Sequence, residues 1–190
     1  MTPTEPPVTL RYASFGRRIG AALIDGAVLI TVVILYEWIG AQSLETAVLS
    51  SVLNQLFWVP YVVYAHGRYG QTLGKYARGI RVVRTDGSPL GWPRAWARSA
   101  VDIAFGVVIL VGAILGASTM SSEEYSALQG WSARSTYRHA HEPAWVDVVT
   151  WASFGWVAVE SIVMLCNPRR RAVHDYIAGS VVIAEPKPEA

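Results

Sequence analysis

The sequence has 190 residues, of which 52% are hydrophobic and 16% charged, with a mean hydropathy of +0.30 and a net charge of +2. Soluble domains carry about 25% charged residues, so this composition favours a membrane protein, and the small net charge gives no reason to expect a nucleic-acid partner. The single cysteine, Cys166, excludes an intramolecular disulfide and a cysteine-rich metal site.

Four apolar windows dominate the chain, and they cover residues 19–40, 47–66, 99–120 and 146–166. Each is close to the roughly 20 helical residues that cross a bilayer core. The first window is longer than the apolar part of a signal peptide, and no small-residue cleavage site follows it, so we expect a retained helix. The sequence therefore predicts an all-α transmembrane helical bundle of about four spans.

The distribution of lysine and arginine predicts the orientation of these spans. The chain holds 16 such residues, and the two loops 41–46 and 121–145 hold only Arg134 and Arg138, which leaves fourteen on the other side. Because basic residues collect on the cytoplasmic side, both termini and the loop 67–98 are predicted to be cytoplasmic. We expect a multi-pass protein of a bacterial cytoplasmic membrane.

The connecting loops differ in their patterns. In the cytoplasmic loop 67–98, GIRVVRTDG alternates apolar and basic residues and reaches the turn signal Asp86-Gly87, which predicts a short β-hairpin. The segment Ser180 to Ala184 is predicted to add a further strand. The external loop 121–145 has no strong secondary-structure signal.

Ionisable side chains inside the spans call for an explanation, because each costs at least about 2–3 kcal/mol in lipid. Asp25 and Glu160 lie at similar depth in the first and fourth spans, and Asp102 enters the third span near the basic loop. Asn54 and Gln55 are two neighbouring polar residues within the second span. The carboxylates either pair with arginines and fix helix packing, or they bind a cation or relay protons.

Partners for the carboxylates are expected among nearby arginines, with Arg98 beside Asp25 and Arg18 beside Asp175. A basic cluster is also predicted to contact anionic lipid headgroups, at about 1 kcal/mol per residue near the surface. Its members are Lys75, Arg78, Arg94, Arg98, Arg169, Arg170 and Arg171. No metal site or cofactor is expected, because His139, His141 and Glu142 are more typical of a solvated loop.

Three segments occur in order around the spans: SFGRRIGAALIDGAVLI, GQTLGKYARGIRVVRTDG and RRRAVHDYIAGSVVI. Together they resemble the RDD family of bacterial membrane proteins, named for one arginine and two aspartates. The resemblance places the arginine at Arg18, the first aspartate at Asp25 and the second at Asp175. It implies one membrane domain over residues 11–184, and we expect residues 1–10 and 185–190 to be disordered.

The resemblance implies a transport-related protein, most concretely an exchanger of a monovalent cation for protons. Four helices enclose little room for a pathway, so we expect a homo-oligomer. The candidate ion- or proton-binding residues are Asp25, Glu160, Asp102 and Asn54.

The alternative is a non-transporting scaffold or assembly factor that binds anionic lipid or a protein partner through its basic cytoplasmic face. An enzyme is not expected, because the chain has no nucleophile motif and no zinc-binding HExxH pattern.

Overall fold

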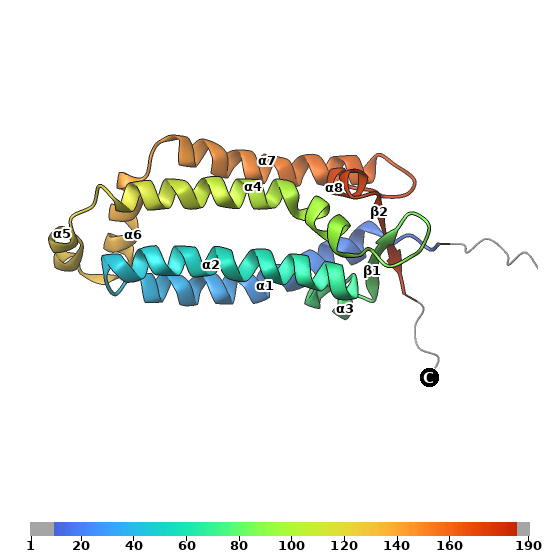
Figure 1. The fold of residues 1–190 in the computed structure, drawn as a ribbon, viewed down its shortest axis with the longest axis horizontal. Coiled ribbons are helices and arrows are strands. Elements are labelled where there is room, and N and C mark those ends of the chain that lie inside the picture. Colours follow the sequence, from blue (N-terminus) through green and yellow to red (C-terminus); the bar gives the residue numbers. More distant parts are fainter. Residues whose placement is uncertain (1–9, 186–190) are drawn as a thin grey trace, which may run out of the picture. The chain divides into compact units, whose positions relative to one another are not determined.

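The computed structural model describes residues 10–185, which are mostly helical (Figure 1). The elements in chain order are α1 (Phe15–Gly40), α2 (Leu44–Tyr64), the π-helical turn η1 (Ala65–Tyr69), α3 (Leu73–Ala77), β1 (Ile80–Arg84), α4 (Trp92–Ala117), α5 (Ser122–Ala127), α6 (Gly130–His141), α7 (Trp145–Leu165), α8 (Val173–Ile177) and β2 (Ser180–Ala184). The predicted disordered ends lie, apart from residues 10 and 185, outside the described residues.

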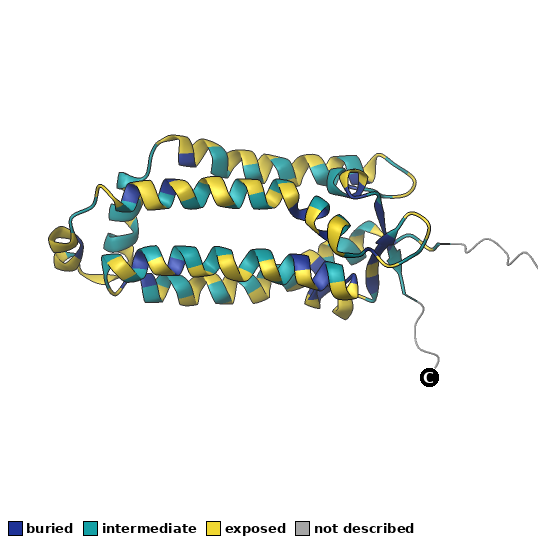
Figure 2. Cartoon of the chain, viewed as in Figure 1, coloured by how far each residue is buried: buried dark blue, intermediate teal, exposed yellow. Residues whose placement is uncertain are grey.

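Within residues 10–185, four helices are long and apolar enough to cross a membrane: α1, α2 continued by η1, α4 and α7. Their surfaces carry many exposed apolar side chains, among them Leu23 (69% exposed), Ile34 (63%) and Trp151 (74%) (Figure 2). Such continuous apolar surface is unusual on a protein in water and normal on one in lipid. The predicted four-span, all-α fold is confirmed, and α4 begins at Trp92, earlier than the predicted span.

The small sheet consists of β1 and β2, which pair antiparallel with Val82 opposite Val182. The predicted strand element is therefore confirmed, but β1 takes its partner from the tail of the chain. The turn that follows β1 forms only an isolated bridge between Val83 and Pro89. Residues 11–13 bind the other edge of β2, which places apolar side chains of both strands in a buried core.

The chain contains a repeat in which α8 and β2 follow α3 and β1 at a spacing of 100 residues, as with Leu73 and Val173. Gly79 (φ 59°) and Gly179 (φ 60°) take the same left-handed conformation between the helix and the strand of each copy. The pairing of Val82 with Val182 relates the two copies by an approximate two-fold axis. Two spans precede each copy, α1 and α2 in the first and α4 and α7 in the second.

Contacts divide the chain into two compact units, which are described separately. Unit 1 comprises Met1–Asp25, Tyr64–Arg98 and Glu160–Ala190, and within its described residues it holds the sheet, α3 and α8. Unit 2 comprises Gly26–Val63 and Ser99–Val159, and it holds most of the length of the four spans together with α5 and α6.

Candidate functional site

A buried charge cluster in unit 1 is centred on Asp175, which lies in the first turn of α8 and is fully buried. Its carboxylate accepts hydrogen bonds from Nη1 of Arg18 (3.1 Å), from Arg98 and from Oγ of Ser180 (2.9 Å). The predicted pairing of Arg18 with Asp175 is thus confirmed. Burial alone would raise the pKa of this carboxyl, but the surrounding positive charges, that of Arg98 first, hold the pKa well below its usual range.

His174 joins this cluster to α7. Its Nε2 lies 2.6 Å from Nη2 of Arg98, and because a guanidinium only donates, Nε2 must accept. Nδ1 therefore carries the proton and donates to Glu160, whose Oε1 also accepts the backbone N–H of His174 (3.1 Å). Burial, reinforced by the charge of Arg98, lowers the pKa of His174, in agreement with a neutral ring.

Asp25 contacts α3 in the same way that Glu160 contacts α8. Its Oδ2 accepts the hydroxyl of Thr72 (2.5 Å) and its Oδ1 accepts the backbone N–H of Gly74 (2.8 Å). Gly74 packs so closely on α1 that an added Cβ would lie 3.0 Å from the carbonyl carbon of Ala21. Gly74 and His174 are equivalent in the repeat, so a spanning helix supplies a carboxylate to the same backbone N–H of each short helix.

Lys75 is half-buried in unit 1. Its ammonium group interacts electrostatically with Asp25 and Asp175 and with the guanidinium groups of Arg18 and Arg98. Burial lowers the pKa of Lys75 to about 8, and the charge of Arg98 acts in the same direction, whereas Asp25 and Asp175 oppose the change. A charged Lys75 is therefore disfavoured in the folded protein relative to the unfolded chain.

We expect the free energy of unfolding to gain a contribution from Lys75 as the pH rises from about 8 to 10.5. In this range the unfolded chain still binds the lysine proton and the folded protein has released it, so a higher pH favours folding. Below pH 8 both states are protonated and the contribution is flat. Thermal unfolding in detergent from about pH 7 to pH 10 should show this rise, and Lys75→Met and Lys75→Arg should lack it. A native curve parallel to that of Lys75→Met would contradict the expectation.

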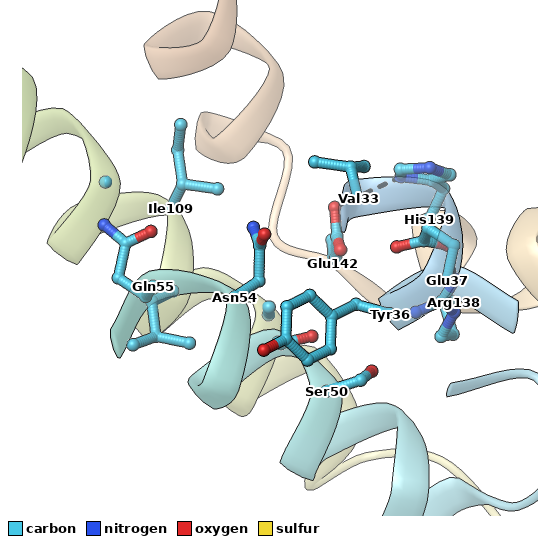
Figure 3. A pocket seen from close by; sticks show the side chains of 14 residues that line it. Val33, Tyr36, Glu37, Ser50, Asn54, Gln55, Ile109, Arg138, His139 and Glu142 are labelled. Atoms are coloured by element: carbon cyan, nitrogen blue, oxygen red, sulfur yellow. Dashed lines mark hydrogen bonds and ion pairs between the residues drawn. The ribbon is translucent and has the colours of Figure 1, made fainter. Parts of the chain in front are cut away.

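Unit 2 contains a cavity of about 350 Å³ among α1, α2 and α4 (Figure 3). Its polar wall comes from α1 and α2 and includes Tyr36, Glu37, Ser50, Asn54 and Gln55. Asn54 lies ten residues into α2, which corresponds to about 15 Å of helix, or about half of a bilayer core. The cavity therefore reaches the middle of the span.

The facing wall belongs to α4 and is apolar, with Gly106, Ile109, Leu110 and Ala113. Gly106 leaves room for a polar neighbour, because an added Cβ would lie 2.9 Å from Cδ of Gln55. The cavity thus combines one polar and one apolar wall.

Residues of the α6 segment close one end of the cavity. Arg138 forms an ion pair with Glu37, and Nδ1 of His139 lies 3.3 Å from Oε2 of Glu142 (Figure 3). All four side chains line the cavity. Two carboxylates therefore face one guanidinium at this end.

The loop 121–145, for which the sequence showed no strong secondary-structure signal, contains the helices α5 and α6. Tyr125 is fully buried and donates its hydroxyl to the carbonyl oxygen of Gly40 (2.9 Å), and Arg134 donates to that of Ala41. These contacts satisfy carbonyl groups at the end of α1 that lack helical partners. Hydropathy did not reveal α5 and α6 because both are polar, and α5 is also only six residues long. Ser121, which accepts the N–H of Glu124 (3.4 Å), is the N-cap of α5 and is the sequence signal for the start of this helix.

The three sequence segments that resemble the RDD family all contribute to unit 1, and the sequence model of the RDD family matches residues 12–179. The chain belongs to the RDD family. The predicted resemblance is thereby confirmed. Comparisons with curated proteins and with solved structures gave no match.

Within this RDD fold, the predicted ion-binding residues separate into two groups. Asp25 and Glu160 belong to unit 1, whereas Asn54 and Asp102 belong to unit 2. Asn54 lines the cavity, and Asp102 is not among its lining residues in the described part of the chain. Whether any of these residues binds an ion or a proton stays a prediction.

The predicted lipid-facing cluster is likewise divided. Arg98, which we expected beside Asp25, is buried and donates to Asp175 and to Oγ of Ser180 (2.9 Å). Arg171 donates to the carbonyl oxygen of Asp175 (2.9 Å) and covers the ring of Tyr176 at 4.0 Å. The exposed members are Arg78 and Arg169, while Lys75, Arg94, Arg170 and Arg171 are half-buried.

Proposed function

We propose that this RDD protein is a transport-related membrane protein that exchanges a cation for protons. The observation that carries the proposal is the cavity of unit 2, whose polar wall reaches the middle of the spans. Polar groups at that depth are costly in lipid and are typical of substrate pathways. The excess of Glu37 and Glu142 over Arg138 favours a cation in the cavity.

The repeat supports the same proposal. Many transporters consist of two repeats of equal topology, with the substrate site near the middle of the membrane where the repeats meet. The cavity is lined by α1 and α2 from the first repeat and by α4 from the second. Its location therefore matches the position of a substrate site in repeat-built transporters.

We assign the cation to the cavity and the proton to groups of unit 1. Asp25 does not line the described cavity, and its oxygens accept hydrogen bonds from Thr72 and Gly74, which gives the carboxylate a role in fixing α3. Glu160 and His174 share a hydrogen-bonded proton, and they are the better candidates for proton exchange. The lysine and arginine distribution supports cytoplasmic termini in a bacterial cytoplasmic membrane, and a homo-oligomer would complete the pathway.

Proton movement in proteoliposomes tests the proposal. With the native protein, addition of a cation should collapse an imposed pH gradient, recorded with a pH-sensitive dye. Asn54→Leu should slow this collapse at least about tenfold, because it removes a polar group that would stabilise the bound cation by about 1.4 kcal/mol. The matched control is Asp147→Asn, which removes an exposed carboxylate of α7 that does not line the described cavity.

The proposal is wrong if native and protein-free vesicles respond alike across inorganic and organic cations and across pH. If Asp147→Asn slows the exchange as much as Asn54→Leu does, the assignment of the cation to the cavity of unit 2 is wrong. The amount of each variant in the vesicles must be equal, so that a slower rate reports transport and not reconstitution.

A specific observation also favours a second function, that of a scaffold at the membrane surface. In α3 and α8, Tyr76 (74% exposed) and Tyr176 (50% exposed) occupy equivalent positions, and Leu73 and Ile177 are exposed beside them. Exposed aromatic and aliphatic side chains near basic residues are typical of helices that lie in the headgroup region. Retention of anionic lipid by the purified protein, together with no transport of any cation, would favour this function.

A further inference from the structure

We propose that the exchanged cation is a small organic ammonium compound with a neutral hydrogen-bonding group at its other end, of the amino alcohol type. This inference rests on the proposed function and names its substrate class. It is carried by the size of the unit 2 cavity, by its apolar wall and by the separation of its charged and neutral polar groups.

The size of the cavity is the first argument. Its volume of about 350 Å³ lies in the range of about 300–1,000 Å³ that is usual for sites of organic ligands. A water molecule takes about 30 Å³ of liquid, and a bare monovalent cation needs a cage of similar size. The cavity therefore has room for a molecule with several carbon atoms and is far larger than a dehydrated inorganic cation requires.

The apolar wall is the second argument. Hard inorganic cations are bound by oxygen ligands on all sides. Here α4 presents Ile109, Leu110 and Ala113 along one side of the cavity, and these residues offer no oxygen ligand from their side chains. A carbon skeleton gains free energy from contact with such a wall, whereas an inorganic cation does not.

The distribution of polar groups is the third argument. At the α6 end, Glu37 is paired with Arg138, so the carboxylate of Glu142 suits an ammonium group, and the ring of Tyr36 is an aromatic neighbour of the kind that attracts organic cations. At mid-span, the amides of Asn54 and Gln55 both donate and accept, which suits a hydroxyl group. Tyr36, Asn54 and Glu142, which are labelled in Figure 3, all line this cavity.

The excess of carboxylates also sets the charge of the ligand. A carboxylate on the ligand would have to lie in the same cavity as Glu37 and Glu142, and like charges in a partly buried site repel. Arg138 is already engaged with Glu37, so its charge is largely compensated. A cation with a neutral polar end is therefore preferred to a zwitterion.

Binding to the purified full-length protein in lipid nanodiscs tests the inference, with choline and ethanolamine as probes. Both should raise the unfolding temperature as their concentration increases, because they bind only the folded protein. Potassium, sodium and the zwitterion glycine betaine at the same concentrations should give at most a tenth of the affinity. Glu142→Gln should weaken choline binding at least tenfold, and Ala113→Leu should abolish it by filling the cavity beside the apolar wall. Asp147→Asn should bind choline like the native protein.

The outcomes separate this inference from the proposed function. If sodium or potassium drives proton movement in proteoliposomes and neither choline nor ethanolamine binds, the substrate class is wrong and cation exchange stands. If glycine betaine binds as well as choline, the neutral end is wrongly assigned. If no cation, inorganic or organic, binds or moves protons, both proposals fail. Choline-driven proton movement that is lost in Ala113→Leu, with the variant still folded, supports both.

Discussion

Replacing Arg98 with methionine should lower the free energy of unfolding by about 3–5 kcal/mol, the usual cost of removing one partner from a buried ion pair. Arg98 is 6% exposed and Asp175 is fully buried. Methionine keeps the length and apolar stem of the arginine, but it removes the donor groups that reach Asp175, His174 and Ser180. The buried carboxylate would then rely on Arg18 for its nearest opposite charge.

Thermal unfolding of the detergent-solubilised protein measures this effect. For a chain of this length, the expected loss corresponds to a fall in Tm of roughly 10 °C. The matched control is Arg169→Met, which removes an exposed arginine from the segment between α7 and α8 and should change Tm by little. An equal change in both variants would show that loss of positive charge, and not loss of the buried pair, decides the stability.

A double substitution sharpens the test. Arg98→Met combined with Asp175→Leu removes both charges, so no buried carboxylate is left without its partner. Because breaking a buried pair costs more than replacing it, the double variant should be more stable than the sum of the two single losses predicts. Additive losses would mean that Arg98 and Asp175 act independently, in spite of their contact.

The parts of this fold that the sequence predicted correctly are those that depend on local composition. A span is recognised by an apolar run of sufficient length, and the contact of Arg18 with Asp175 was expected from the charges at the span end and in the tail. The partner of β1 was not predicted, because the turn after β1 and the tail strand offer similar apolar patterns. Burial of Val181 and Val182 in the core decides between them, and burial depends on the assembled unit.

The candidate site was less predictable, because most of its contacts depend on the assembled fold and not on local composition. Asn54 was identified because a polar amide within an apolar run is visible in any sequence. The end of the cavity that α6 closes was not predicted, because the contact of Glu37 with Arg138 depends on how the polar segment 121–145 folds. The role of His174 depends on which ring nitrogen accepts from Arg98, a detail that only the assembled cluster fixes.

Asp25→Asn should lower the free energy of unfolding by about 1–3 kcal/mol, the usual cost of leaving a buried donor without its acceptor. The carboxylate accepts from two donors, the hydroxyl of Thr72 and the backbone N–H of Gly74. An asparagine side chain has a single acceptor oxygen, so its NH₂ group would face one of these donors. Thermal unfolding should therefore show a loss for Asp25→Asn. Thr72→Val should also show a loss, because it removes one of the two contacts of Asp25 together with the N-cap of α3, where the hydroxyl accepts the N–H of Lys75 (3.4 Å).

The same variant decides between the two roles that a carboxylate in a span can have. If Asp25 only fixes α3 against α1, the Asp25→Asn protein that remains folded should exchange cations at close to the native rate, and Thr72→Val should not add its full cost to that of Asp25→Asn. If Asp25 itself carries the ion or the proton, transport per folded molecule should be lost while Tm stays near the native value. The hydrogen bonds of Asp25 with Thr72 and Gly74 favour the first result, because they tie both oxygens of the carboxylate to α3 and its N-cap.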